Sequence, residues 1–101
     1  MKGLEINTNS LNCFLVNDKK VQLVNKHLES SGITLTKREA ECFYLLAQGI
    51  TSKKIAKVLD LSPRTVEEYI IKIKNKIGVS YKWELSMKAM HLILETYGQD
   101  F

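Results

Sequence analysis

The sequence predicts a small all-α protein: four helices, preceded by a segment that has room for one more. Three observations predict this class. Period-two alternation of apolar and polar residues, which is typical of strands, is scarce. Helix caps divide residues 35–96 into four parts, and apolar residues recur at helical spacing inside each part. The chain has 101 residues, the length of one small domain.

The first expected helix follows Thr36. In TKRE, Thr36 is the N-cap and Glu39 stands three residues later, which forms a capping box that satisfies N–H groups without helical partners. Leu35, just before the cap, is placed to act as a hydrophobic staple. Gly49 is a C-cap glycine. The expected inward stripe contains Cys42, Phe43, Leu46 and Ala47.

The second expected helix is short, and the third is longer and has a clear cap at each end. The second begins near Thr51 or Ser52 and ends around Asp60, with Ile55, Ala56 and Leu59 facing inward. The third has Ser62 as its N-cap and Pro63 at the first helical position, where the missing N–H of proline costs nothing. It is expected to span residues 63–77 before Gly78.

The fourth helix is expected to start after Ser80 and to end at residues 97–98. It has two apolar faces, and a helix with two apolar faces needs two partners. One face holds Leu85, Ala89 and Leu92. The second face is predicted to pack against another protomer in a homodimer or against residues 13–28 of the same chain. It consists of Trp83, Met87, Met90 and Leu94.

Residues 1–32 are treated as an N-terminal segment of unknown role, and residues 33–97 as the helical domain. Residues 7–12 have the composition of a loop. Residues 21–32 form a candidate extra helix ended by Gly32, with Val21, Val24 and Leu28 on one side. The segment is therefore a linker, an extra helix against the domain, or the remnant of an upstream domain.

Positive charge is concentrated in one part of the chain. The formal net charge is +4, and residues 50–78 carry seven Lys and Arg residues against three acidic residues. A local basic surface suits a polyanionic partner. The alternative is a solvated lysine-rich surface, which is common.

The third helix has distinct faces when its residues are placed at 100° intervals. Val66, Ile70, Ile73 and Ile77 form a narrow apolar stripe that is expected to face the core. Glu67 and Lys74 lie on one flank of the helix, and Thr65, Tyr69 and Lys76 lie on the other. The opposite, exposed face holds Arg64, Glu68, Ile71, Lys72 and Asn75.

The second and third helices and the DLS turn between them predict a helix-turn-helix. In this motif the second helix enters the DNA major groove and the first crosses the backbone. An outward Ile71 then has a use, because an aliphatic side chain can pack on the thymine methyl group. Lys53 and Lys54 begin the first of these helices, where ammonium groups and backbone N–H groups meet phosphate together.

The chain resembles the LuxR-type (FixJ- or GerE-type) helix-turn-helix domain of bacterial transcriptional regulators over about 60 of its 101 residues. The matching segments are LTKREAECFYLLAQG (35–49), TSKKIAKVLDLSPRTVEEYIIKIKNKIGV (51–79), KWEL (82–85) and Ala89. The resemblance implies a four-helix domain that binds double-stranded DNA and dimerises through its fourth helix. RNA polymerase is a further candidate partner.

The resemblance also implies roles for individual residues. Thr51, Ser52 and Lys53 would meet phosphates, Thr65 and Tyr69 would lie against the DNA backbone, and positions 67, 68 and 71 would face bases. Glu67 departs from the family, in which many members carry Lys or Arg there. The candidate DNA-binding residues are Thr51, Ser52, Lys53, Lys54, Arg64, Thr65, Glu67, Glu68, Tyr69, Ile71, Lys72, Lys74 and Asn75.

Glu67 and Glu68 have two interpretations. Acidic side chains near a helix N-terminus stabilise the helix because they interact with the positive end of its dipole. Glu68 also has Lys72 four residues later for an ion pair. Alternatively, a carboxylate in the major groove accepts a hydrogen bond from the cytosine amino group and selects against other bases. The pair is also the best argument for the alternative function, a protein-interaction module that kept the fold and lost DNA binding.

Other classes have little support in the sequence. There is no Ser/His/Asp or Cys/His arrangement, no phosphate-binding glycine loop and no metal-ligand spacing, so neither an enzyme nor a cofactor is expected. Cys42 is expected to be a small buried hydrophobe, and the two cysteines, Cys13 and Cys42, do not form a disulfide framework. The chain lacks a membrane-spanning apolar run and a signal peptide, so a cytoplasmic location is expected.

Overall fold

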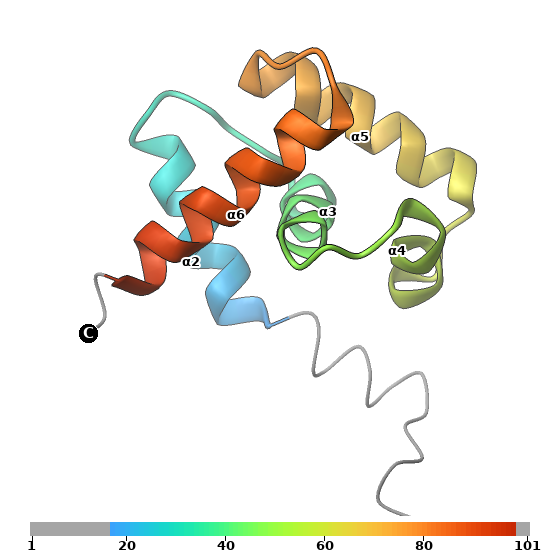
Figure 1. Ribbon diagram of the computed structural model, residues 1–101. Helices are drawn as coiled ribbons and strands as arrows, with labels where there is room; N and C mark the ends of the chain where they lie inside the picture. The colour runs from blue at the N-terminus through green and yellow to red at the C-terminus, as the bar shows by residue number, and fades with distance from the viewer. Residues whose placement is uncertain (1–16, 99–101) are drawn as a thin grey trace, which may run out of the picture.

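The computed structural model describes residues 17–98, with only the backbone described at 96–98. This part of the chain contains five helices and no strand. The central helix, at residues 37–47, contacts each of the other four (Figure 1). The all-α class and the extra helix before the four expected ones are therefore confirmed. The helices are α2 (Asp18–Glu29), α3 (Lys37–Ala47), α4 (Ser52–Leu59), α5 (Pro63–Ile77) and α6 (Lys82–Gly98).

The predicted caps define the helix ends. Thr36 and Glu39 form the capping box at the start of α3, and the Thr51 side chain accepts from the Lys54 N–H at the start of α4. Ser62 caps α5, with Pro63 in its first turn. Because each cap is a local interaction between residues three apart, sequence spacing was sufficient to locate it.

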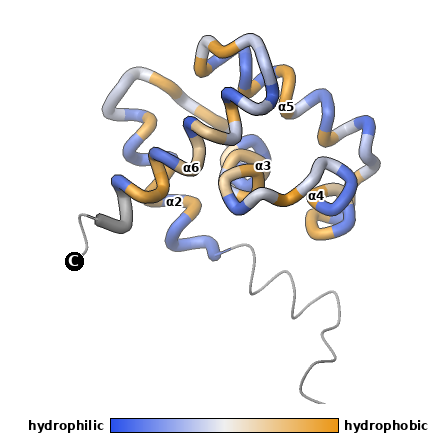
Figure 2. The backbone as a smooth tube through the Cα atoms, viewed as in Figure 1, coloured by the Kyte–Doolittle hydropathy of each residue, from blue (hydrophilic) through white to orange (hydrophobic). Residues whose placement is uncertain are grey.

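Helix α3 is more deeply buried than its predicted stripe implied. Every residue from Glu39 to Ala47 is buried, including Tyr44, Leu45 and the carboxylates Glu39 and Glu41. Figure 2 shows this helix in the middle of the other helices, each of which contains hydrophobic positions along its length. A helix that contacts four neighbours has no solvated side, so a one-sided stripe underestimated its burial.

Helix α2 packs against α3 and α6. Its side chains Val21, Val24 and Leu28 are buried in the common core, as their spacing predicted. The helix ends at Glu29, and Gly32 forms the following turn with a positive φ of 83°. Residues 18–29 thus form an extra helix against the domain, which is one of the three interpretations given for residues 1–32. The loop expected at residues 7–12 and Cys13 lie outside the described residues.

Helix α6 covers α3 with one face. Leu85 and Ala89 are fully buried, Leu92 is half-buried, and Ile93, which was not in the predicted face, is also buried. The inward face thus extends to Ile93, and α6 contacts α2 as well as α3. Its other face is exposed.

Candidate nucleic-acid interface

A short turn joins α4 to α5. Helix α4 ends where Asp60 adopts the left-handed conformation (φ 58°, ψ 48°), which Asp tolerates better than most residues. The Leu61 N–H donates to the Ala56 carbonyl at 2.8 Å, and Ser62 Oγ accepts from the Thr65 N–H at 3.1 Å. These bonds fix the direction of α5 relative to α4, so the two helices form the predicted helix-turn-helix.

The faces of α5 are those that its periodicity predicted. Val66, Ile70 and Ile73 are buried, and Ile77 is half-buried at the end of the helix. Ile71 is 52% exposed among polar neighbours. An aliphatic side chain is therefore presented outward on a rigid, capped helix. The other exposed residues of this face are Arg64, Glu68, Lys72 and Asn75.

The flanks of α5 are partly covered. Thr65, Tyr69 and Lys74 are half-buried. The Lys72 ammonium lies 5.9 Å from the centroid of the Tyr69 ring, within the range of a cation–π contact. This contact gives Lys72 a partner other than the expected Glu68, and it joins two of the candidate DNA-binding side chains.

The two acids of α5 have partners that differ from the expected ones. Glu68 Oε2 lies 4.0 Å from Arg64 Nε, one turn earlier, rather than beside Lys72. Glu67 Oε2 lies 3.9 Å from Lys82 Nζ of α6 rather than beside Lys74. Both pairs are largely exposed and weak in the free protein. The Glu67 partner was missed because Lys82 reaches it only after α6 folds back beside α5.

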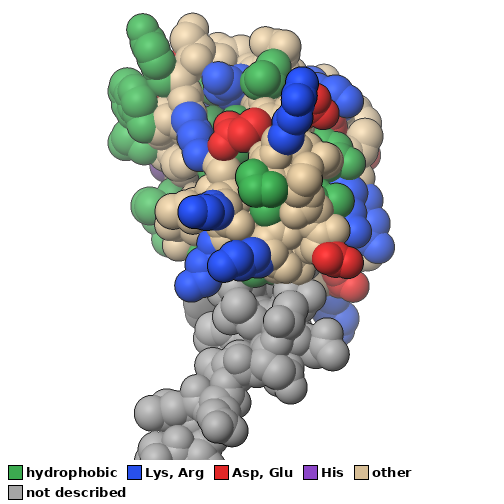
Figure 3. Space-filling view, turned by 90° about the vertical axis from the view of Figure 1, so that its right-hand side faces the viewer, with side chains coloured by type: hydrophobic (Ala, Val, Ile, Leu, Met, Phe, Trp, Pro, Cys, Tyr) green, Lys and Arg blue, Asp and Glu red, His purple; other side chains and the backbone are tan. Residues whose placement is uncertain are grey.

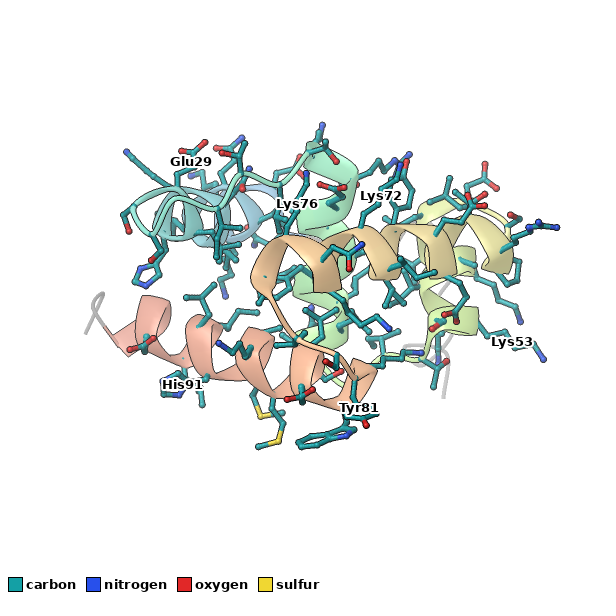
Figure 4. The ribbon with its side chains drawn as sticks, turned by 90° about the horizontal axis from the view of Figure 1, so that it is seen from above. Glu29, Lys53, Lys72, Lys76, Tyr81 and His91 are labelled. Carbon is teal, nitrogen blue, oxygen red and sulfur yellow. The ribbon has the colours of Figure 1, made fainter. Side chains whose placement is uncertain are left out.

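The start of α4 presents cations but not the Ser52 hydroxyl. Lys53 and Lys54 are exposed, and Figure 4 shows Lys53 pointing away from the other helices. Ser52 is only 7% exposed, and its Oγ accepts a hydrogen bond from Lys82 Nζ. Its side chain is thus occupied within the protein. Ser52 itself can therefore meet a phosphate only through its backbone N–H, which lacks a helical acceptor in this first turn.

Lys76, one of the seven cations of the basic segment, is used internally. Its Nζ lies 2.7 Å from Glu39 Oε1 and donates to the Thr34 carbonyl at 3.1 Å. Burial by itself raises the pKa of Glu39, but hydrogen bonds from Lys76 and from the Thr36 N–H outweigh burial and hold that pKa below its usual value. Figure 4 shows Lys76 and Lys72 on successive turns of α5. Both are exposed, but Lys76 is held by Glu39 and Thr34, whereas Lys72 lies beside Tyr69.

The end of the molecule that carries α4 and the start of α5 has mixed charge. Figure 3 shows this side, on which Lys and Arg side chains surround separate acidic ones. Cations at several points of a surface can contact successive phosphates, while an acid among them restricts which DNA can approach closely.

Comparison with known proteins identifies the family. The family model described as "Bacterial regulatory proteins, luxR family" matches residues 33–89, which include α3, α4 and α5. The chain belongs to the LuxR family. It is a LuxR-type DNA-binding transcriptional regulator domain, as its motifs predicted, and this family consists of regulators rather than enzymes.

Individual relatives agree with this assignment. The spore germination protein GerE of Bacillus subtilis (strain 168) is 49% identical over 58 residues, which cover 57% of this chain and 78% of GerE. The transcriptional regulatory protein UhpA of Escherichia coli (strain K12) is 37% identical over 76 residues, 75% of this chain and 37% of UhpA. The transcriptional activator protein ExaE of Pseudomonas putida is 41% identical over 61 residues, 60% of this chain and 27% of ExaE. The chain thus corresponds to only part of UhpA and ExaE. No solved structure gives a significant match.

The LuxR-type domain leaves one face of α6 uncovered by the other described residues. Trp83, Met87, Met90 and Leu94 are 49–63% exposed. Tyr81, which the sequence reasoning missed, stacks on Trp83 with ring centroids 6.3 Å apart and extends the apolar surface. Figure 4 shows Tyr81 and His91 along the side of α6 that faces away from the other helices. The described part of α2 packs elsewhere on α6, so its residues do not cover this face.

A metal site, a reactive thiol and a membrane span each have structural requirements, which apply to residues 17–98 as follows. This part of the LuxR-type domain holds no group of three His, Cys, Asp or Glu side chains suited to a metal ion. Burial raises the pKa of the Cys42 thiol to about 12, with Glu41 adding to the effect, so it is a buried hydrophobe as predicted. None of the helices over the same residues combines the length and apolar character needed to cross a membrane.

Proposed function

We propose that this domain binds double-stranded DNA at specific sequences, with α5 in the major groove and the first turn of α4 on the phosphate backbone. The main support is the exposed face of α5. It combines an outward aliphatic side chain, Ile71, with the polar groups of Lys72 and Asn75 on a helix whose start is fixed by Ser62. Such a face offers both apolar contact with a thymine methyl and hydrogen bonds to base edges.

Within this proposal the candidate residues divide by role. Thr51, Lys53, Lys54 and the Ser52 backbone N–H contact phosphates at the start of α4. Arg64, Thr65, Tyr69 and Lys74 lie against the DNA backbone at the groove edges. The residues that face bases are Glu67, Glu68, Ile71, Lys72 and Asn75.

The assembly proposed is a homodimer through the exposed α6 face, acting in the bacterial cytoplasm and, at promoters, contacting RNA polymerase. Met, Trp and Tyr are enriched at protein interfaces. A two-fold dimer would bind a site with two inverted halves.

Selection of binding sites from random DNA, followed by titration of the selected and a scrambled duplex at several salt concentrations, tests the proposal. Ile71→Ala is expected to weaken binding to the selected duplex only, because it removes an apolar base contact. A Lys53→Ala/Lys54→Ala variant is expected to weaken binding to both and to reduce the salt slope by roughly one per lost phosphate contact.

Lys19→Ala/Lys26→Ala is the matched control, because it removes two exposed cations of α2, far along the chain from the helix-turn-helix. It is expected to bind like wild type. If the wild-type domain selects no sequence, the proposal of sequence-specific binding is wrong. If its binding also does not depend on salt, the fold serves protein interaction instead.

A further inference from the structure

Lys82 lies where three helices meet. It is the first residue of α6, its Nζ donates to Ser52 Oγ in the first turn of α4, and the same Nζ is 3.9 Å from Glu67 Oε2 on α5. One ammonium group therefore contacts the helix proposed to lie on phosphates and the helix proposed to enter the groove. Lys82 lies outside the basic segment at residues 50–78, and spacing within any single helix gives no sign of this contact.

Glu67 needs such a partner if α5 approaches DNA. Its carboxylate is 54% exposed on a flank of α5, and phosphates on either side of the groove would repel it. Glu68 has Arg64 within its own helix, but Glu67 has its cation only through tertiary contact. Lys82 is the cation that the described structure brings to it.

We propose that Lys82 is a positioning residue for DNA recognition: it neutralises Glu67 and holds that side chain at the edge of the groove, and Ser52 anchors the ammonium group that does so. This inference rests on the proposed function, because it has a consequence only if α5 faces DNA. The ammonium suits the task because it has three donors and can serve a hydroxyl and a carboxylate together.

Bound DNA is expected to strengthen the attraction between Lys82 and Glu67. Lys82 and Glu67 side chains are 43% and 54% exposed in the free protein, so water screens their attraction. DNA lying over α4 and α5 excludes part of that water, and the same two charges then attract more strongly. Ser52 is buried, so its contact with Lys82 keeps the ammonium in place before DNA arrives.

A double-mutant cycle tests the inference. Wild type, Lys82→Met, Glu67→Gln and the double variant are titrated with the selected and the scrambled duplex. Lys82→Met is expected to weaken binding to both duplexes by roughly tenfold, because Glu67 is left uncompensated beside phosphate. The double variant is expected to recover to within about threefold of wild type, because removing Glu67 removes the repulsion. Lys82→Arg is expected to bind like wild type.

Glu68→Gln provides the matched control, because Glu68 is the neighbouring acid but pairs with Arg64. Combining it with Lys82→Met restores the same net charge as combining Glu67→Gln with Lys82→Met. Adding Glu68→Gln to Lys82→Met is expected to leave the loss of DNA affinity essentially unchanged. If affinity recovers only when Glu67→Gln is added, Lys82 acts through a local pair with Glu67. Equal recovery in both double variants would show that only net charge matters and would overturn the inference.

Two further results would also decide against it. If Lys82→Met costs the same affinity with and without Glu67, Lys82 contacts phosphate directly and does not act through Glu67. If wild type shows no preferred duplex, the proposed function fails, and this inference fails with it. Melting temperatures identify any variant that loses its fold, and Lys82→Gln, which keeps a donor for Ser52 without the charge, then replaces Lys82→Met in the cycle.

Discussion

Glu39 connects two distant parts of the chain through one carboxylate. Its Oε1 accepts from the Thr36 N–H at 2.9 Å, which closes the capping box of α3, and from Lys76 Nζ at 2.7 Å. The side chain is 3% exposed. A buried charge is tolerated only when it is paired and hydrogen-bonded, so Lys76 is needed for Glu39 to remain charged there. A residue that sequence spacing assigned only to a cap also fixes the end of α5 against α3.

Glu39→Gln is expected to lower the free energy of unfolding at neutral pH by about 1–3 kcal/mol. Glutamine can still accept the Thr36 hydrogen bond, so the loss reports mainly the pair with Lys76. The pKa of Glu39 is lowered from its usual value of 4.5. The stabilisation it provides is therefore fully present above about that pH and is lost as the pH falls through the lower, folded-state pKa.

Urea denaturation of wild type and Glu39→Gln at several pH values measures this. The difference between them is expected to be constant near neutral pH and to shrink as the pH falls below about 4.5. Glu29→Gln on the exposed side of α2 is the control. It should change neither the free energy of unfolding nor its dependence on pH. A difference that stayed the same at all pH values would contradict the assigned ion pair.

Helix α2 is part of the same packed structure as the LuxR-type helices, although the family match begins only at residue 33. Val24 is fully buried, and Val21 and Leu28 accompany it in the core shared with α3. The Asn25 amide also donates to the Leu35 carbonyl at 3.3 Å. Packing and a hydrogen bond across ten residues make α2 a stabilising element rather than a free linker.

Val24→Ala is expected to lower the free energy of unfolding by about 2 kcal/mol, because it removes buried apolar surface and leaves a cavity. Leu23→Ala, at the adjacent and 42% exposed position, is expected to change it by less than about 1 kcal/mol. Thermal or urea denaturation compares the two. Equal effects would mean that α2 does not share a cooperative core with the other helices.

At the scale of the whole molecule, the helix-turn-helix lies at one end, and the apolar face of α6 that the other described residues leave exposed lies along one edge (Figure 1). These surfaces lie on different elements, so the proposed contacts with DNA and with a second copy are compatible with each other. Lys82 begins α6 and contacts both α4 and α5, which physically connects the two surfaces.

Met90→Glu is expected to keep the protein monomeric, because it places a charge within the exposed apolar face. In sedimentation equilibrium, the apparent mass of the wild-type protein is expected to rise with concentration from the monomer mass of 11.6 kDa toward twice that value. Lys88→Glu, which introduces the same residue on another side of α6, should still dimerise. A monomer mass at every concentration, with and without the selected DNA, would count against the dimer.

The sequence by itself determined the four helices after residue 35, the caps that begin α3, α4 and α5, and the faces of α5. Caps join residues three or four apart and helical faces follow from period, so both are local, and motifs at fixed spacing were sufficient for the family. The tertiary structure decided that α2 packs on the domain, that Ser52 is buried and that Lys76 pairs with Glu39. It also gave Glu67 its partner. Lys76 and Glu39 are 37 residues apart and Lys82 and Ser52 are 30 apart, so such pairs exist only once the helices have packed.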